Sequence, residues 1–192
     1  CATGVAAVLD AARAASPPVW IARHDEIARW WRDRMESTVV VAAAARPGWV
    51  RVGAHGPPGL TLLARNVAVT GPTEPWGRDT VKVCGTTAEV HAEPRRPFIG
   101  VHADCPAGVS GFLREQGYIV EDTRSGDDHT CVVWRDRFGP EDRQPLLAEI
   151  AARSVPIVRL GRWPSGATSA VSVTGDVDAL TIGDYASRLR GH

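Results

Sequence analysis

Two aspartates near the end of the sequence, Asp176 and Asp178, have a spacing that could support hydrolysis. They follow the apolar run "SAVSVTG" (169–175), and alternation along an extended chain points both side chains to the same side. One carboxylate could bind a divalent metal ion while the other accepts a proton from water. Asp178 also stands three residues before Thr181, a position that fits a helix N-cap. The pair is therefore either a catalytic site or a polar strand end with a helix cap.

Histidine and cysteine side chains offer a second candidate metal site. His102 is followed by Asp104 and Cys105 in the run "VHADC", and His91 belongs to the strand predicted just before it. Zinc ligands usually cluster more tightly than the eleven residues that separate His91 from His102. The spacing favours surface or structural histidines over a metal centre.

Seven tryptophans form a third group of candidates, because an indole ring can stack on a sugar ring. Three fall on apolar faces of predicted elements and fit a core: Trp20, Trp30 and Trp31. Three others stand beside Gly or Pro, where exposure is easier: Trp49, Trp76 and Trp163. A carbohydrate-binding surface would show two or more exposed, roughly coplanar rings on one sheet face.

Composition limits the classes of partner. The 192 residues include 22 basic and 22 acidic side chains, so net charge gives no argument for nucleic acid. No apolar run approaches the ~20 residues that span a bilayer. The chain starts with Cys rather than Met, and we expect a fragment whose cellular location the sequence leaves unknown. The four cysteines contain no CxxC pair, which disfavours a zinc ribbon and leaves a disulfide open: Cys1, Cys84, Cys105 and Cys131.

Hydrophobic periodicity divides the chain into three regions of a mixed α/β protein. Residues 1–36 predict helix–strand–helix, the end of an α/β layer or barrel. Residues 37–96 change to a period of two with Pro, Gly and Asn between short runs, which predicts a β-rich accessory region. Residues 97–192 predict a mixed α/β layer, in which "YIVEDT" (118–123) and "HTCVVWRD" (129–136) form a hairpin.

Two segments resemble polysaccharide deacetylases of the NodB-homology family, especially those of actinobacterial type. The segment "VWIARHDEIARWWRDR" (19–34) resembles the last strand and helix of the family's barrel. The segment "RWPSGATSAVSVTGDVDALTIGDYASRLRG" (162–191) resembles the C-terminal segment of larger family members. Together they cover about a quarter of the chain.

The resemblance implies a distorted (β/α) barrel that removes N-acetyl or O-acetyl groups from a glycan. In such enzymes an aspartate acts as base, and another aspartate with two histidines binds a divalent metal, commonly zinc. Carried onto this chain, it makes Asp176 the base and Asp178 the metal ligand. The candidate substrate-binding residue is Trp163, whose place beside a proline favours exposure. The family's His-x-x-x-His pair is absent from this sequence, so we expect the fragment itself to be inactive.

The resemblance also predicts a tertiary contact. If the first and last strands of a barrel are neighbours, the strand at Ala170–Val173 should pair beside the strand at Val19–Ala22. The alternative hypothesis is a non-catalytic carbohydrate-binding or interaction module that uses Trp49, Trp76 or Trp163.

Overall fold

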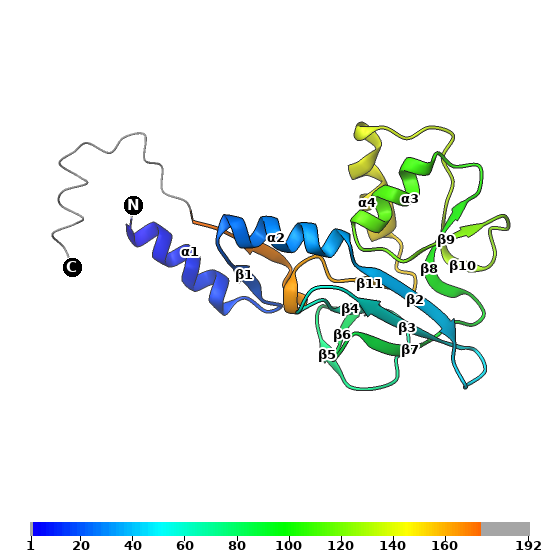
Figure 1. Cartoon of the computed structure of the whole chain (residues 1–192), viewed down its shortest axis with the longest axis horizontal. Coiled ribbons are helices and arrows are strands. Elements are labelled where there is room, and N and C mark those ends of the chain that lie inside the picture. Colours follow the sequence, from blue (N-terminus) through cyan, green and yellow to red (C-terminus); the bar gives the residue numbers. More distant parts are fainter. Residues whose placement is uncertain (1, 174–192) are drawn as a thin grey trace.

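The computed structural model describes residues 2–173, a mixed α/β fold with several small sheets (Figure 1). Its N-terminal residues form the predicted helix–strand–helix, α1 (Ala2–Ala14), β1 (Val19–Ile21) and α2 (His24–Met35). Helix α2 begins where Glu26 accepts a hydrogen bond from the Arg23 N–H (2.8 Å), and its acidic first turn suits the helix dipole. Trp30 is the buried aromatic residue on its inner side.

The β-rich region forms two antiparallel sheets. One has the strand order β2-β3-β7 and the other β11-β4-β6-β5. Their bounds are β2 (Thr38–Ala43), β3 (Trp49–His55), β4 (Leu62–Arg65), β5 (Thr73–Pro75), β6 (Thr80–Val83), β7 (Thr87–His91) and β11 (Ile157–Leu160). The predicted change to a period of two is confirmed in β3, where Val50, Val52 and Ala54 are buried and the residues between them are more exposed.

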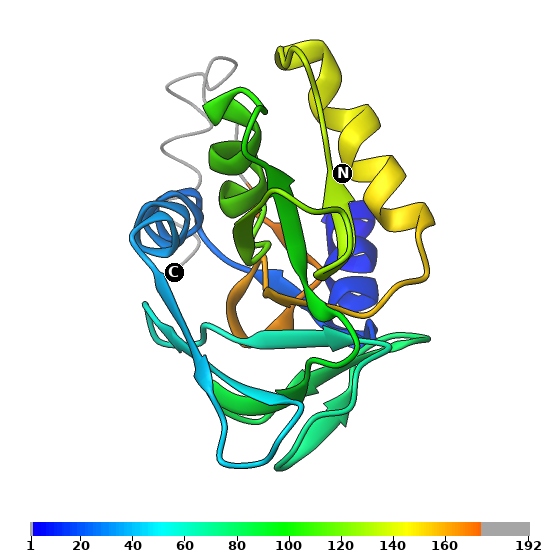
Figure 2. The ribbon, with the colours of Figure 1, turned by 90° about the vertical axis from the view of Figure 1, so that its right-hand side faces the viewer.

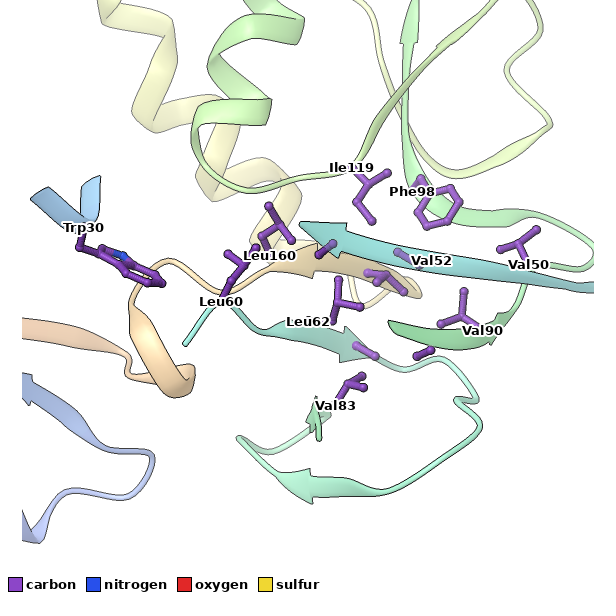
Figure 3. Close-up of a cluster of buried hydrophobic side chains, with 14 residues drawn as sticks. Trp30, Val50, Val52, Leu60, Leu62, Val83, Val90, Phe98, Ile119 and Leu160 are labelled. Atoms are coloured by element: carbon purple, nitrogen blue, oxygen red, sulfur yellow. The ribbon is translucent and has the colours of Figure 1, made fainter. Parts of the chain in front are cut away.

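A first hydrophobic core fills the space between these two sheets (Figure 3). Leu62 of β4, Val52 of β3 and Val90 of β7 are almost completely buried there. Phe98 and Ile119 enter it from the α/β layer, and Trp30, Val83 and Leu160 also belong to it. The core therefore joins segments from all three regions predicted from the sequence.

The α/β layer is a three-stranded parallel sheet with the order β10-β8-β9. Its elements are β8 (Arg96–His102), α3 (Ala107–Glu115), β9 (Val120–Thr123), β10 (His129–Val133), the 3-10 turn η1 (Pro140–Asp142) and α4 (Arg143–Ala152). In Figure 2, α3 and α4 lie to the left and right of these strands, but both cover the same face of the sheet, because buried residues of both helices share one core with Ile99 and Val101 of β8. A second hydrophobic core includes Ile99 of β8, Leu113 of α3 and Leu146 of α4.

The predicted hairpin between β9 and β10 is wrong, because both strands pair in parallel with β8. Thr123 ends β9 opposite His102, at the carboxyl end of β8. His129 begins β10 opposite Arg96, at the amino end of β8, so the intervening loop carries the chain back along the sheet. The turn residues correctly marked a break between two strands, but the strands run in the same direction on the two edges of β8.

The last described strand, β12 (Ser169–Val171), follows the 3-10 turn η2 (Pro164–Gly166). It pairs in parallel with β1, which confirms the predicted contact between the strands at Val19–Ala22 and Ala170–Val173. No closed barrel is seen within residues 2–173. No helix in this part of the chain is long and apolar enough to cross a membrane.

Candidate functional site

The strand that leads to the aspartate pair has a defined place in the fold. Val19 pairs with Ser169, Trp20 with Ala170 and Ile21 with Val171. Two further bonds flank this ladder: Ala22 N–H donates to Val171 O (3.0 Å), and Thr168 N–H donates to Pro18 O (2.9 Å). Asp176 and Asp178 themselves lie outside the described residues, so their roles as base and metal ligand stay predictions.

A cluster of four tryptophans holds the two resembling segments together. The Trp163 ring lies 5.6 Å from Trp31 and 6.2 Å from Trp20, measured between ring centroids, and Trp20 lies 6.2 Å from Trp30. The Trp30 indole N–H also donates to Arg162 O (3.1 Å). Tilted and edge-on rings at these distances stabilise packing beyond the area that they bury. Trp163 is half-buried in this cluster, so its packing role is visible and its substrate-binding role stays a prediction.

Arg34 ties α2 to the same region. Its side chain is only 3% exposed, and it donates to Gly161 O (3.0 Å) and Glu115 O (2.8 Å). Burial lowers its pKa to about 10, and the nearby charges of Arg162 and Arg159 act in the same direction. The buried guanidinium therefore satisfies two main-chain carbonyls in a locally electropositive part of the molecule.

The two histidines of the second candidate site are not brought together into a metal centre. His91 ends β7, where it is exposed and lies edge-on to Trp49. His102 ends β8, with its Nδ1 atom 3.5 Å from Asp104 Oδ2. Within the part of the chain that the structure describes, no three His, Cys, Asp or Glu side chains form a group that could hold a metal ion.

A cavity of about 680 Å³ lies at the carboxyl ends of β8 and β9. Open parallel sheets commonly bind ligands at this edge. His102, Arg114, Asp122 and Arg124 line the cavity with mixed charge. Cys105 also lines it, with its sulfur accepting a hydrogen bond from the Arg135 N–H (3.2 Å). The arrangement can offer hydrogen bonds to a polar molecule, but no hydrogen bond joins the Cys105 thiol to the His102 ring.

An ionic network that was not predicted from the sequence surrounds Glu121. Arg96 donates two hydrogen bonds to its carboxylate (2.6 and 2.5 Å), and His129 Nε2 lies 2.8 Å from the same group. Burial alone would raise the pKa of Glu121, but the bonds from Arg96 and His129 outweigh burial and lower it. His129 is only 5% exposed and begins β10, whereas its sequence context resembles a turn. The usable signal was the alternation of "HTCVV", which buries His129 on the side of Cys131 and Val133.

The tryptophans expected to be exposed are not arranged as a sugar-stacking surface. Trp49 and Trp76 are each half-buried, and the Arg46 guanidinium lies 4.4 Å from the ring centroid of Trp49. Trp134, which no motif singled out, is the most exposed of the described tryptophans at 56%. No pair of exposed, coplanar indoles occurs within residues 2–173.

The described cysteines are free thiols in three different environments. Cys84 is exposed, Cys105 is half-buried and Cys131 is buried. Burial raises the pKa of Cys131, so its thiol stays protonated and behaves as a core residue.

Comparison of the chain with protein-family models, curated proteins and solved structures found no match.

Proposed function

We propose that the chain carries barrel segments of a polysaccharide deacetylase-like protein that hydrolyses acetyl groups on a glycan. The observation that supports this proposal is the parallel pairing of β1 with β12. These strands come from the two segments that resemble the family, and they are about 150 residues apart along the chain. The tryptophan cluster of Trp20, Trp30, Trp31 and Trp163 packs the same two segments side by side.

Parallel strands end at the same edge of their sheet, and in barrels that edge carries the active site. In the sequence Asp176 and Asp178 follow β12 within seven residues of Val171. In this proposal Asp176 accepts a proton from the water that attacks the acetyl carbonyl, and Asp178 provides a second carboxylate. The described residues do not fit a metal site, so the metal chemistry implied by the resemblance is not assigned to any of them.

Acetate release tests the proposal directly. The chain and the longest reading frame that contains it are incubated with N-acetylglucosamine oligomers and with O-acetylated oligosaccharides. We expect Asp176→Asn to lower the rate of acetate release by roughly 100-fold or more, the usual contribution of a general base. Asp184→Asn is the matched control, because Asp184 is a third carboxylate in the same segment. Acetate release that is absent from both proteins, or unchanged in Asp176→Asn, would contradict the proposal.

The role of Asp178 as a helix cap has its own test. Asn caps a helix about as well as Asp, whereas Ala costs about 1 kcal/mol. A cap therefore predicts that Asp178→Asn keeps both activity and stability while Asp178→Ala loses stability. A catalytic or ligand role predicts that Asp178→Asn loses activity with an unchanged free energy of unfolding.

A further inference from the structure

One face of the sheet β11-β4-β6 is hollowed into a cavity of about 220 Å³. Alternation points Val158, Leu160 and Leu62 into the first core, and the residues between them to the opposite face. The antiparallel register then places Arg159, Leu63 and Lys82 in one row across the strands, and Ile157, Arg65 and Thr80 in the next. Trp76, Asp79 and Tyr118 complete the walls of the cavity.

The three basic side chains on this face, Lys82, Arg65 and Arg159, differ in their interaction partners. Lys82 is neutralised by Glu74, with 2.7 Å between Nζ and Oε2. Arg65 donates to main-chain carbonyls at the end of α4, among them Arg153 O (2.7 Å) and Ile150 O (3.3 Å), so it acts as a helix cap. Arg159 makes no side-chain hydrogen bond and no ion pair with any residue between 2 and 173.

Arg159 is half-buried and lies beside two aromatic rings. Its guanidinium carbon lies 5.8 Å from the centroid of Trp76 and 5.9 Å from that of Tyr118. Burial lowers its pKa below the ordinary value, and the charges of Arg65 and Arg162 act in the same direction. A partly desolvated cation without a counter-charge is unfavourable, and a bound anion would remove most of that cost.

We propose that this cavity binds a small hydroxylated ring that carries a carboxylate, the chemistry of a uronic acid. The planar fork of Arg159 suits the two oxygens of a carboxylate. Trp76 and Tyr118 offer apolar surface to the ring, and Thr80 and Asp79 offer polar atoms to its hydroxyl groups. The volume lies below the roughly 300–1,000 Å³ of cavities for drug-sized ligands, which limits the occupant to about one sugar unit.

This inference does not depend on the proposed deacetylase activity. The cavity is built from β4, β6, β11 and the residues around them, all of which the structure describes. Binding at Arg159 needs neither Asp176 nor Asp178. A failure of the acetate-release assay would therefore leave the binding test unaffected, and the reverse also holds.

Titration of the full chain with D-glucuronate at low ionic strength, without added metal, tests the site. Calorimetry gives the affinity, and the indole N–H signal of Trp76, which donates to Gly166 O, reports binding inside the cavity by NMR. We expect glucuronate to bind at least 10-fold more tightly than D-glucose, because only glucuronate supplies the counter-charge. We also expect glucuronate to bind more tightly than acetate, which lacks the ring.

Two substitutions that each remove one positive charge locate the site. Arg159→Met should weaken glucuronate binding at least 10-fold. Arg162→Met is the matched control and should weaken binding far less than Arg159→Met does, because the Arg162 side chain is exposed, lies over Trp31 outside the cavity, and contributes only its charge at a distance. Arg159→Lys replaces Arg159→Met if the latter does not fold, and should also weaken binding because it lacks the planar fork.

A variant that should bind glucuronate more tightly than the wild type provides a further test. Asp79→Asn removes a negative charge from the cavity and leaves a carbonyl oxygen that can accept the Thr80 hydroxyl, as Asp79 now does at 3.1 Å. Glucuronate should therefore bind this variant several-fold more tightly. Equal binding by wild type and Arg159→Met, equal binding of glucose and glucuronate, or weaker binding by Asp79→Asn would overturn the proposal. Tighter binding of inorganic phosphate or equal binding of acetate would overturn the assignment of a sugar carboxylate.

Discussion

Three arginines with little or partial exposure, Arg34, Arg65 and Arg159, have different roles in this protein. Arg34 and Arg65 satisfy main-chain carbonyls, so each holds segments together that are distant in the sequence. Arg159 satisfies none of the described groups and faces a cavity. A charged residue within an apolar strand, as in "PIVRLG", is the sequence signal that could have indicated Arg159. Only the structure shows that its neighbour Lys82 already has a partner whereas Arg159 does not.

The network around Glu121 predicts a pH dependence of stability. Its pKa is lower in the folded protein than its ordinary value of 4.5, because hydrogen bonds from Arg96 and His129 outweigh the opposing effect of burial. The stabilisation is therefore fully present above pH 4.5 and is lost as the pH falls through the folded-state value. We expect Glu121→Gln to reduce the free energy of unfolding by about 1–2 kcal/mol at pH 7.

Urea denaturation at pH 7, 5, 4 and 3 measures this effect. The difference between wild type and Glu121→Gln should shrink as the pH falls below 4.5. Glu141→Gln is the control, because Glu141 is exposed and its replacement should change stability by less than about 0.5 kcal/mol. A wild-type advantage that stays constant down to pH 3 would refute the contribution of the Glu121 carboxylate.

Among the elements, the short ladder between β1 and β12 is stabilised more by side-chain packing than by its few main-chain hydrogen bonds. Three residue pairs form the ladder, and a two-stranded ladder of this size is marginal in water. The tryptophan cluster on α2, β1 and the segment before η2 supplies the packing that it needs. Trp163 is central because its ring contacts the rings of both Trp20 and Trp31.

Removing Trp163 should therefore release β12 from β1. We expect Trp163→Ala to lower the free energy of unfolding by about 2 kcal/mol, less than a fully buried tryptophan would cost. Hydrogen exchange should lose protection at the Ala22 and Thr168 amides, which donate to Val171 O and Pro18 O. Trp134→Ala, at a largely exposed position, should leave both amides protected. Protection that survives in Trp163→Ala would show that the cluster does not stabilise the ladder.

At the scale of the whole molecule, β11 connects the two hydrophobic cores. Val158 and Leu160 point into the first core, and Ile157 belongs to the second. The strand also pairs with β4, while Phe98 of β8 packs into the first core and its neighbour Ile99 into the second. Because both cores share strands, neither can lose its packing without exposing residues of the other.

The protein should therefore unfold in one transition. Urea titration followed by NMR should give the same midpoint for amides in the first core, such as Val52, and in the second, such as Val109. Leu62→Ala, in the first core, should lower both midpoints together by an amount equivalent to about 3 kcal/mol. Val40→Ala, at an exposed position, should change neither. A second core that keeps the wild-type midpoint in Leu62→Ala would show two independent folding units.

Local patterns in the sequence determined the kind of most elements, because periodicity and turn residues act within a few positions. They correctly predicted α2 from its apolar period and its acidic first turn, and α3 up to the positive φ of Gly117. They could not predict that β9 and β10 lie on opposite edges of β8, because the edge that a strand joins is chosen by long-range packing. The contact between β1 and β12 was predicted from a resemblance, which carries long-range information that periodicity lacks.

For the candidate sites too, the sequence identified the residues, and the tertiary structure showed their surroundings. Residue identities and spacing showed which side chains are reactive or aromatic, and they singled out Asp176, Asp178 and Trp163. Tertiary structure alone decided that Trp163 packs against two other tryptophans and that Arg159 faces a cavity without a counter-charge. The physical reason is that desolvation and pairing are properties of the surroundings of a side chain, and strands far apart in the sequence build those surroundings.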